Sequence, residues 1–494
     1  MSCKAISLSF GLLFIALFLA VWHDILPPKS PRPIIEDQWF GPGQRPKKEN
    51  KEIKPFKINF GDKNLKDLKS RITSDLERLK AVNIKPLEDS AFEYGFNIDY
   101  LVNEIGPYWL NKYDWKTQEK MLNTILPQFK TSIDGIDVHF AHVKPKVKGK
   151  KVLPILMVHG WPGSFIEFTK IIPMMTEMKD QDFVFEVIAP SIPGYGFSSS
   201  PAKMGFDAIY SAKIFTELMQ RLGHDTFYCQ GGDWGSLITD SLTTLYPEKV
   251  RGLHLNMIAV NTPSANLKLI VANLVPSLVL EKKDYSKVIP IKERFGVLLK
   301  ESGYMHIQAT KPDTVGKCFL HQNFKTSNQF FGVAISQDFL LFTGLGLTTS
   351  PLGLASYILE KFSTWTKKSN PNAKDGNLLE KFTIDELLNN IMIYWINGNI
   401  IPSQRFYKEN FGENFGALDN VPIEKVPVAL AAFPEEIFNQ PENFITGKYR
   451  NIVSYTDMPV GGHFAAYEQP KLLFDDIIQF VAKVENDTKN KDEL

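Results

Sequence analysis

A short glycine-rich stretch places a carboxylate where a nucleophile is expected. Gly231-Gly232-Asp233-Trp234-Gly235 follows an apolar run, Thr226–Gln230, and opens into an amphipathic segment, Ser236–Tyr246. A strand, a sharp turn between small residues and a helix are the context of a nucleophile elbow, and the glycines leave room for its crowded backbone. A carboxylate that attacks an sp³ carbon, as in an epoxide or alkyl halide, forms an ester that water can hydrolyse. Asp233, standing where a serine is usual, therefore predicts this chemistry. An ordinary β-turn is the alternative.

Hydrolysis of that ester needs donors for an oxyanion and a base for water. In such an elbow the donors are the amide after the nucleophile and one from the loop after an earlier strand. They are predicted to be the backbone N–H groups of Trp234 and Trp161, the latter within His159-Gly160-Trp161-Pro162 unless that loop is only a connection. Among nine histidines, His463 is the candidate base because Gly461-Gly462 precedes it, after a strand and before the last helix.

An acid that orients the histidine is expected between nucleophile and histidine in the chain. Phe433-Pro434-Glu435-Glu436 follows a predicted strand, Val426–Ala431, and offers two carboxylates. Spacing does not choose between Glu435 and Glu436, and either one could be a solvated loop acid.

The elements that position these residues are predicted to form a parallel, doubly wound sheet. Short apolar runs alternate with helical segments such as Ala208–Leu222, and the runs are Val152–Val158, Phe185–Ala189 and Val250–Met257. A long helix-rich stretch then intervenes before strands resume at Val426–Ala431 and Asn451–Thr456, followed by a closing helix, 471–484. An insertion between two sheet strands is most simply a lid over the carboxyl ends of the strands.

The chain before the sheet begins with a candidate membrane anchor. Ala5 to Trp22 is uncharged and about long enough to cross a bilayer, and no small-x-small cleavage site follows, which favours an anchor over a signal peptide. Prolines stiffen the linker after it, and Asp134-Gly135 predicts a hairpin turn. The predicted divisions are anchor 1–24, linker 25–54, N-terminal helical extension 55–150, core 151–260, helical lid 261–424, second part of the core 425–485, and tail 486–494.

Composition excludes several classes of protein. The 494 residues are 44 % hydrophobic and 22 % charged, which is ordinary for a globular chain. A formal net charge of +1 gives no basic excess for binding nucleic acid. Three cysteines make no disulfide framework, and no C-x-x-C pair suggests a metal.

The chain resembles the microsomal epoxide hydrolase family, which includes the juvenile-hormone epoxide hydrolases of insects and has the α/β-hydrolase fold. The resemblance runs from the N-terminal anchor to about Ala482. The matching stretches are long and specific: His159–Phe165, Gly231–Leu237, Glu301–Val315, Tyr357–Thr366, Arg405–Asn410 and Gly461–Tyr467.

The resemblance implies roles residue by residue. The nucleophile falls on Asp233, the base on His463 and the charge-relay acid on Glu436, whereas the family is apolar at Glu435. Two lid tyrosines that protonate the epoxide oxygen match positions that the residues alone would not single out among sixteen tyrosines. These are Tyr304 and Tyr407.

The reaction so implied converts an apolar epoxide to a vicinal diol through an ester of Asp233, with water activated by His463 and no metal or organic cofactor. A haloalkane dehalogenase is one alternative, but its lid would need halide-binding donors in place of a tyrosine pair. A non-catalytic membrane scaffold is another, and loss of the catalytic residues would have favoured it. The sequence does not choose among xenobiotic arene and alkene oxides to be detoxified, lipid epoxides and a terpenoid hormone.

The C-terminus bears on location. Lys491-Asp492-Glu493-Leu494 matches a luminal retrieval signal of the endoplasmic reticulum, and Asn486-Asp487-Thr488 is a glycosylation sequon. Both act only in the lumen, whereas members of the resembling family are usually described as facing the cytosol. The prediction is a protein of the endoplasmic reticulum membrane, with a luminal catalytic domain favoured and the KDEL receptor as a partner.

One segment, Lys317–Gly344, has no counterpart in the family pattern. The family runs almost directly from a stretch like Lys311–Gly316 into one like Leu345–Pro351. Codons for 316–318 can contain a splice-donor consensus and those for 339–344 a splice acceptor, so the segment is predicted to be a retained intron. A genuine surface loop is the alternative, because insertions cost little closure entropy.

Overall fold

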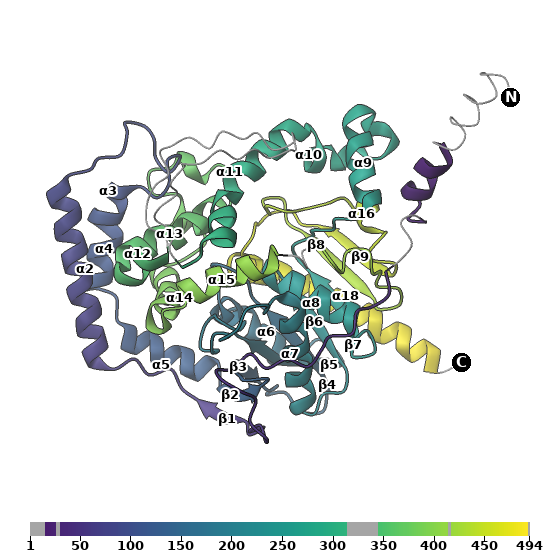
Figure 1. Cartoon of the computed structure of the whole chain (residues 1–494), viewed down its shortest axis with the longest axis horizontal. Coiled ribbons are helices and arrows are strands. Elements are labelled where there is room, and N and C mark those ends of the chain that lie inside the picture. The colour runs from purple at the N-terminus through teal and green to yellow at the C-terminus, as the bar shows by residue number, and fades with distance from the viewer. Residues whose placement is uncertain (1–14, 26–29, 314–343, 413–415, 493–494) are drawn as a thin grey trace.

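The computed structural model describes residues 15–25, 30–313, 344–412 and 416–492. Within these residues nine strands form one sheet in the order β1-β2-β3-β5-β4-β6-β7-β8-β9 (Figure 1). The strands are β1 Lys54–Phe56, β2 Gln128–Ile133, β3 Ile136–Val143, β4 Lys151–Val158, β5 Phe183–Pro190, β6 Phe227–Gly231, β7 Val250–Leu255, β8 Val428–Ala432 and β9 Ile452–Asp457.

The six strands from β5 to β9 in this order are parallel, as the alternation of apolar runs with helices predicts. β1, β2 and β3 add an antiparallel edge that joins the parallel part where β3 pairs with β5. The hairpin between β2 and β3 turns at Asp134 and Gly135, both with positive φ. The sheet is therefore mostly, rather than wholly, parallel.

Helices cover the sheet and extend it. α8 (Trp234–Leu245) packs against β4, β6 and β7 with α7 (Ala208–Arg221) beside it. α18 (Pro470–Asp492) packs against β7, β8, β9 and α6 (Ile171–Thr176). α18 runs from Pro470 to Asp492, well past the predicted end at residue 484. No glycine or proline follows Val484 to stop it, and the Thr488 hydroxyl donates to the Val484 carbonyl. Residues 486–492 thus continue the helix instead of forming a separate tail.

A set of helices lies between β7 and β8, where the sequence predicts an inserted helix-rich stretch. They are α9 Pro263–Leu274, α10 Tyr285–Val288, α11 Ile291–Thr310, α12 Gly344–Thr349, α13 Pro351–Thr364, α14 Ile384–Asn397 and α15 Ile400–Asn410. α14 begins with a capping box between Thr383 and Glu386 and ends at Gly398, whose φ is positive. Hydrogen bonds from Tyr394 to the carbonyl of Gly163 and from Tyr195 to that of Ser403 join α14 and α15 to the loops after β4 and β5. The inserted helices therefore cover the carboxyl ends of these strands.

The N-terminal helices pack against the inserted helices. α2 (Asp62–Val82) packs against α13, and α5 (Trp115–Ile125) packs against α14 (Figure 1). Just before α5, the Tyr113 hydroxyl donates to Asn389 Oδ1 at 2.6 Å. The buried stripe of α2, Leu68, Ile72 and Leu76, supplies its apolar contact. This extension braces the inserted helices from outside.

The N-terminal end of the described chain is a short helix, residues 15–22. No helix in the described part of the chain is long and apolar enough to span a membrane. Residues 1–14 of the predicted anchor, residues 317–343 of the predicted insertion and the last two residues of the retrieval signal lie outside the described residues.

Candidate active site

Asp233 lies at the sharp turn between β6 and α8. Its φ of 50° and ψ of −128° are unfavourable for a residue with a side chain, and the turn is held by close backbone contacts. A Cβ on Gly231 would overlap the carbonyl of Gly235, and one on Gly235 would overlap that of Val158. The turn has the geometry of a nucleophile elbow, and its glycines are required by space.

The loop after β4 lies directly over the Asp233 carboxylate. The Trp161 backbone N–H donates to Asp233 Oδ1 at 2.7 Å, and Gly160 leaves no room for a Cβ because the Asp233 side chain occupies that space. Trp234 is the first residue of α8, so its N–H has no partner within the helix. Both predicted oxyanion donors are therefore at the nucleophile.

His463 lies on the other side of the same carboxylate. Its Nε2 is 3.3 Å from Asp233 Oδ2, and its backbone N–H donates to the carbonyl of Trp365 at 3.0 Å. The loop approaches Trp365 so closely that a Cβ on Gly462 would overlap that carbonyl. The Gly461-Gly462 pair thus lets the histidine reach the nucleophile.

The two glutamates, between which spacing does not choose and of which the resemblance implies Glu436, lie in different surroundings. Glu436 is buried and its Oε1 lies 2.9 Å from His463 Nδ1. Glu435 points elsewhere, where its Oε2 accepts from the backbone N–H of Lys368 at 3.1 Å. Asp233, His463 and Glu436 form one hydrogen-bonded line.

The charges in this line set the protonation of the histidine. Burial disfavours the charged ring, but the carboxylates of Glu436 and Asp233 outweigh burial and raise the pKa of His463 well above its usual value. Both carboxylates thus favour the imidazolium form of the ring in the resting enzyme.

Two tyrosines come from the inserted helices, Tyr304 from α11 and Tyr407 from α15. Their hydroxyl oxygens are 3.3 Å apart. The Tyr304 ring stacks on Trp161 with centroids 4.9 Å apart, and the Tyr407 ring meets Trp234 edge-on at 4.7 Å. Burial, with a further contribution from the negative charge of Asp233, raises the pKa of both phenols well above the usual value. Both phenols therefore keep their protons at neutral pH.

A cavity of about 20 Å³ adjoins Asp233 and His463 on the side of the core. It is also lined by Glu167, Gln230 and Asn256. Gln230 donates to Asn256 Oδ1 at 2.8 Å, but its own buried Oε1 has no hydrogen-bond partner among the described residues. The cavity is large enough for one water molecule and presents polar groups to it.

Glu167 is the site residue that the sequence did not suggest. It lies in the 3₁₀ turn Phe165–Thr169, just after the loop that carries Trp161, and its carboxylate fills the space that a Cβ on Gly163 would need. Burial raises the pKa of Glu167 to about 8; the charge of Asp233 adds to the effect and His463 opposes it. The missing side chain at Gly163, four residues earlier, is the local signal that could have pointed to it.

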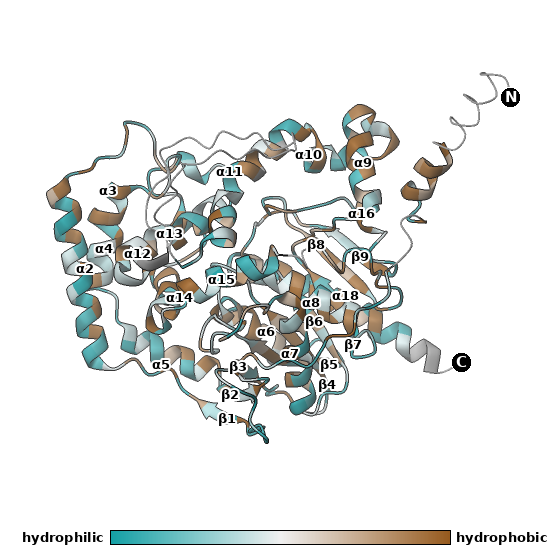
Figure 2. Ribbon diagram, in the orientation of Figure 1, coloured by the Kyte–Doolittle hydropathy of each residue, from teal (hydrophilic) through white to brown (hydrophobic). Residues whose placement is uncertain are grey.

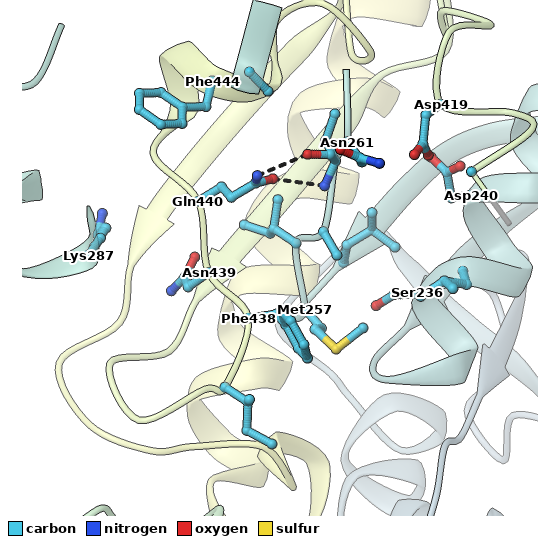
Figure 3. A pocket seen from close by; sticks show the side chains of 18 of the residues that line it. Ser236, Asp240, Met257, Asn261, Lys287, Asp419, Phe438, Asn439, Gln440 and Phe444 are labelled. Atoms are coloured by element: carbon cyan, nitrogen blue, oxygen red, sulfur yellow. Dashed lines mark hydrogen bonds between the residues drawn. The ribbon is translucent and has the colours of Figure 1, made fainter. Parts of the chain in front are cut away.

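A larger pocket of about 620 Å³ (Figure 3) is not lined by Asp233, His463, Tyr304 or Tyr407 themselves. Apolar side chains such as Leu237, Met257 and Phe438 line it, and Leu237 is one helical turn beyond Asp233. Trp365 also lines it, with its ring 4.9 Å from that of His463 and 5.3 Å from that of Tyr304. Trp365 is thus a wall shared by the pocket and the reacting groups.

Comparison with known proteins gives concordant matches along the chain. Residues 53–168 match the family described as "Epoxide hydrolase N terminus", and residues 154–280 match "alpha/beta hydrolase fold". The chain is 46 % identical to "Epoxide hydrolase 1" of Oryctolagus cuniculus, over 91 % of this chain and 93 % of that protein. It is 44 % identical to "Juvenile hormone epoxide hydrolase 1" of Ctenocephalides felis, over 94 % of this chain and 93 % of that protein.

Solved structures agree with these sequence matches. The crystal structure of juvenile hormone epoxide hydrolase from the silkworm Bombyx mori matches with a TM-score of 0.81 and 37 % identity, over 92 % of this chain and 99 % of that chain. The structure of Aspergillus niger epoxide hydrolase matches with a TM-score of 0.66 and 25 % identity, over 89 % of this chain and 99 % of that one.

Proposed function

Because the chain belongs to the family of microsomal and juvenile-hormone epoxide hydrolases, it is an epoxide hydrolase of the α/β-hydrolase fold, and we propose that it works through an alkyl ester on Asp233. This membership decides against the dehalogenase and the non-catalytic scaffold that the sequence left as alternatives. The observation that carries the ester mechanism is the buried line from Asp233 through His463 to Glu436.

In the first step an oxygen of Asp233 attacks an epoxide carbon, and the bond from that carbon to the ring oxygen breaks. The leaving oxygen takes a proton from Tyr304 or Tyr407, whose pKa values keep them protonated. The second phenol, 3.3 Å away, stabilises the charge left on the first. Two phenols on the lid side and a carboxylate on the core side suit attack from opposite faces of the ring.

In the second step water hydrolyses the ester. Esterification removes the negative charge of Asp233, one of the contributions that hold the pKa of His463 up, so this pKa falls. The imidazolium proton returns to the phenolate left by the first step, and the neutral ring can then accept a proton from the attacking water. Glu436 then stabilises the imidazolium that forms. The tetrahedral oxyanion receives hydrogen bonds from the Trp161 and Trp234 amides. On collapse the leaving diol oxygen takes the proton that His463 received from water, and the Asp233 carboxyl gives its own proton to His463, which restores the resting enzyme.

The cavity of about 20 Å³ is the proposed position of that water. Below pH 8 the Glu167 carboxyl is protonated and can donate to the water, while Gln230 Oε1 can accept from it. These contacts leave a lone pair of the water free to attack the carboxyl carbon of Asp233. Glu167 is thus a positioning residue for hydrolysis.

Single turnover in ¹⁸O-water tests the ester. Excess enzyme with limiting styrene oxide should give unlabelled diol first, with the label in the Asp233 carboxylate found by peptide mass spectrometry. A matched reaction in ordinary water gives the background. Label that enters the diol directly in the first turnover would falsify the ester mechanism.

The apolar pocket supports an apolar substrate that extends beyond the epoxide. We propose that the part of the substrate away from the ring lies in this pocket, against Trp365 and Leu237. Diol formation measured on styrene oxide, a fatty-acid epoxide and a juvenile hormone compares small, linear and terpenoid substrates. A preference for styrene oxide, together with indifference to Leu237→Trp, would contradict the use of this pocket.

We propose attachment to the endoplasmic reticulum membrane through residues 1–24, with α9 lying against the lipid. α9 and the turn after it expose Ile270, Leu274 and Leu278 at 58, 76 and 69 % of their surfaces. The N-terminal helix joins α9 where Ser264 donates to Asp24, and both helices are strongly hydrophobic in Figure 2. Deletion of residues 1–24 should leave residual membrane binding. The double change Leu274→Glu and Leu278→Glu, added to the deletion, should remove that residual binding. Full release from the membrane by the deletion alone would argue against a role for α9.

The C-terminal sequon and retrieval signal support a luminal catalytic domain with the KDEL receptor as a partner. The Asn486 side chain is exposed on α18, where a glycan could be carried. A glycan on Asn486 that endoglycosidase removes is the expected result, with Asn486→Gln as the control. Digestion of the catalytic domain by protease added to sealed microsomes would place it in the cytosol.

A further inference from the structure

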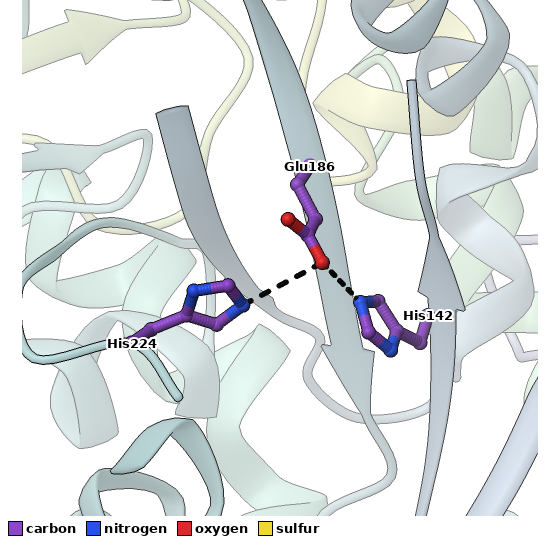
Figure 4. A group of neighbouring side chains, drawn as sticks. All are labelled: His142, Glu186 and His224. Carbon is purple, nitrogen blue, oxygen red and sulfur yellow. Dashed lines mark hydrogen bonds and ion pairs between the residues drawn. The ribbon is translucent and has the colours of Figure 1, made fainter. Parts of the chain in front are cut away.

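Three side chains with metal-ligand chemistry meet away from the nucleophile (Figure 4). His142 lies on β3, Glu186 on β5, and His224 in the turn between α7 and β6. His142 Nε2 is 2.6 Å and His224 Nε2 is 3.6 Å from the same oxygen, Glu186 Oε1. Their side chains are only 10 to 15 % exposed. Three separate segments thus bring two imidazoles and a carboxylate to one point.

The proposed reaction does not use this cluster. Glu186 lies four residues before the carboxyl end of β5, whereas the active site is built at that end. His142 is near the end of β3, which runs antiparallel to β5 and so away from the active-site loops. None of the three residues lines the cavity beside Asp233.

His224 is the member that packing alone does not account for. His142 and Glu186 already satisfy each other with a hydrogen bond. The buried Nε2 of His224 points at Glu186 Oε1 from 3.6 Å, within ion-pair distance but too far for a hydrogen bond, and it makes no hydrogen bond to any other described residue.

The geometry of the three donor atoms fits a small divalent ion. No two of them are more than 4.8 Å apart, and two of the separations are 2.6 and 3.6 Å. A point therefore exists at most about 2.4 Å from all three, within a few tenths of an ångström of the 2.0–2.2 Å bonds of zinc. Two imidazoles, one carboxylate and a water are a common zinc donor set, and imidazole ligands favour late first-row metals over magnesium or calcium.

We propose that His142, Glu186 and His224 form a binding site for one Zn²⁺ ion. The ion takes the place of the hydrogen-bond proton between His142 and Glu186, which is released to solvent, and Nε2 of His224 becomes the third protein ligand. It ties β3 and β5 to the turn that leads into β6, the strand that ends at the nucleophile. Its role is to stabilise this part of the sheet, and the hydrolysis itself takes place elsewhere.

Zinc binding to the full-length protein, without an affinity tag, tests the proposal. The His463→Gln background removes the buried catalytic imidazole as a competing ligand. After chelation and dialysis, one equivalent of zinc should bind and raise the melting temperature by about 3–5 °C at a hundredfold excess over Kd. His224→Gln should weaken binding about 100-fold or more, since it removes a direct ligand.

Matched variants separate a site from general zinc affinity. His306→Gln changes an exposed histidine of α11 and should bind zinc like the parent. Glu186→Gln should no longer bind zinc. His224→Gln keeps the His142–Glu186 pair, so this variant should fold with the melting temperature of the metal-free parent. Co²⁺ can replace zinc as a spectroscopic probe. Cobalt absorption bands that are present in the parent and absent in His224→Gln would show that His224 is a ligand of the bound metal. Absence of stoichiometric binding, or equal zinc affinity in His224→Gln and the parent, overturns the proposal.

Discussion

The two sides of Asp233 are lined by side chains of different chemistry. On the lid side lie neutral aromatic groups, with the Tyr304 and Tyr407 phenols over Trp161 and Trp234. On the core side lie buried ionisable groups, His463, Glu436 and Glu167. Under the proposed mechanism the lid side serves ester formation and the core side serves ester hydrolysis. Each half-reaction thus has a separate set of residues, which mutation can address separately.

The two sides are also held in different ways. The core side sits on strand ends and on loops whose glycines are required by backbone contact. The lid side depends on helices inserted between β7 and β8, which the N-terminal extension braces through contacts such as Tyr113 with Asn389. The core side is accordingly fixed by short-range geometry, and the lid side by contacts between distant segments.

The largest effect is expected where the two sides meet. Asp233→Ala removes the atom that forms the ester, so diol formation should fall by about 10⁶-fold. His463→Gln should still form the ester but not hydrolyse it, so an alkyl-enzyme should accumulate and be visible by intact-mass spectrometry. An Asp233→Ala enzyme with measurable turnover, or a His463→Gln enzyme without the adduct, would contradict the assignment of ester formation and ester hydrolysis to separate sets of residues.

The neighbouring glutamates give a matched pair on the core side. Glu436→Gln keeps the shape but removes the charge next to His463 Nδ1, and should slow hydrolysis of the ester about 10³–10⁴-fold. Glu435→Gln, which only loses a contact with Lys368, should stay within about twofold of the parent. Rapid-quench measurement of the adduct separates hydrolysis from ester formation. Equal effects of the two changes would show that the observed hydrogen bond does not matter.

The phenols test the lid side. Tyr304→Phe and Tyr407→Phe should each slow ester formation about 10–100-fold, and the double change should slow it more, because each phenol can serve as the proton donor. Hydrolysis of a preformed ester should be unaffected. Stopped-flow fluorescence of the buried tryptophans follows both steps. Loss of hydrolysis with normal ester formation would reverse the assignment of the two sides.

The protonation of Glu167 should make the rate of ester hydrolysis, but not that of ester formation, depend on pH. Its pKa of about 8 means that the carboxyl donates below that pH and ionises above it, so hydrolysis should fall above about pH 8. In the ester the charge of Asp233 is gone, which lowers the pKa of Glu167, and His463 is neutral, which raises it. These two changes oppose each other, so the alkaline limb of the pH–rate profile should remain near pH 8. Glu167→Gln keeps a donor and should lose the limb, whereas Glu167→Leu should be about tenfold slower at neutral pH. An unchanged alkaline limb in Glu167→Gln would assign it to another group.

The smallest effect is expected from deleting residues 317–344. The chain on both sides is held by α15, through the bidentate pair of Arg405 with Asp313 and through packing of α12. A short connection should therefore suffice, and the deleted enzyme should keep its diol-forming activity and express at least as well. The parent expressed in parallel is the control. A loss of activity with intact folding would indicate a working loop, and transcripts that all retain the segment, without genomic splice signals, would exclude an intron.

Features that depend on short-range backbone geometry could be predicted from the sequence. The elbow at Asp233 and the turn at Asp134-Gly135 follow from the few residues that tolerate such backbones, and β4 to β9 follow from short apolar runs. The family membership also followed from local stretches, and the relatives bear it out. Even the histidine loop was marked by its two glycines.

Only the tertiary structure decided where side chains from distant segments point. Adjacent residues Glu435 and Glu436 differ because one faces Lys368 and the other His463, which no spacing encodes. No local pattern indicates Glu167, because its environment comes from segments far apart in the chain. The antiparallel edge of the sheet and the packing of α2 on α13 likewise depend on long-range pairing. Local backbone preferences are written in short stretches, whereas burial and charge at a site are properties of the assembled chain.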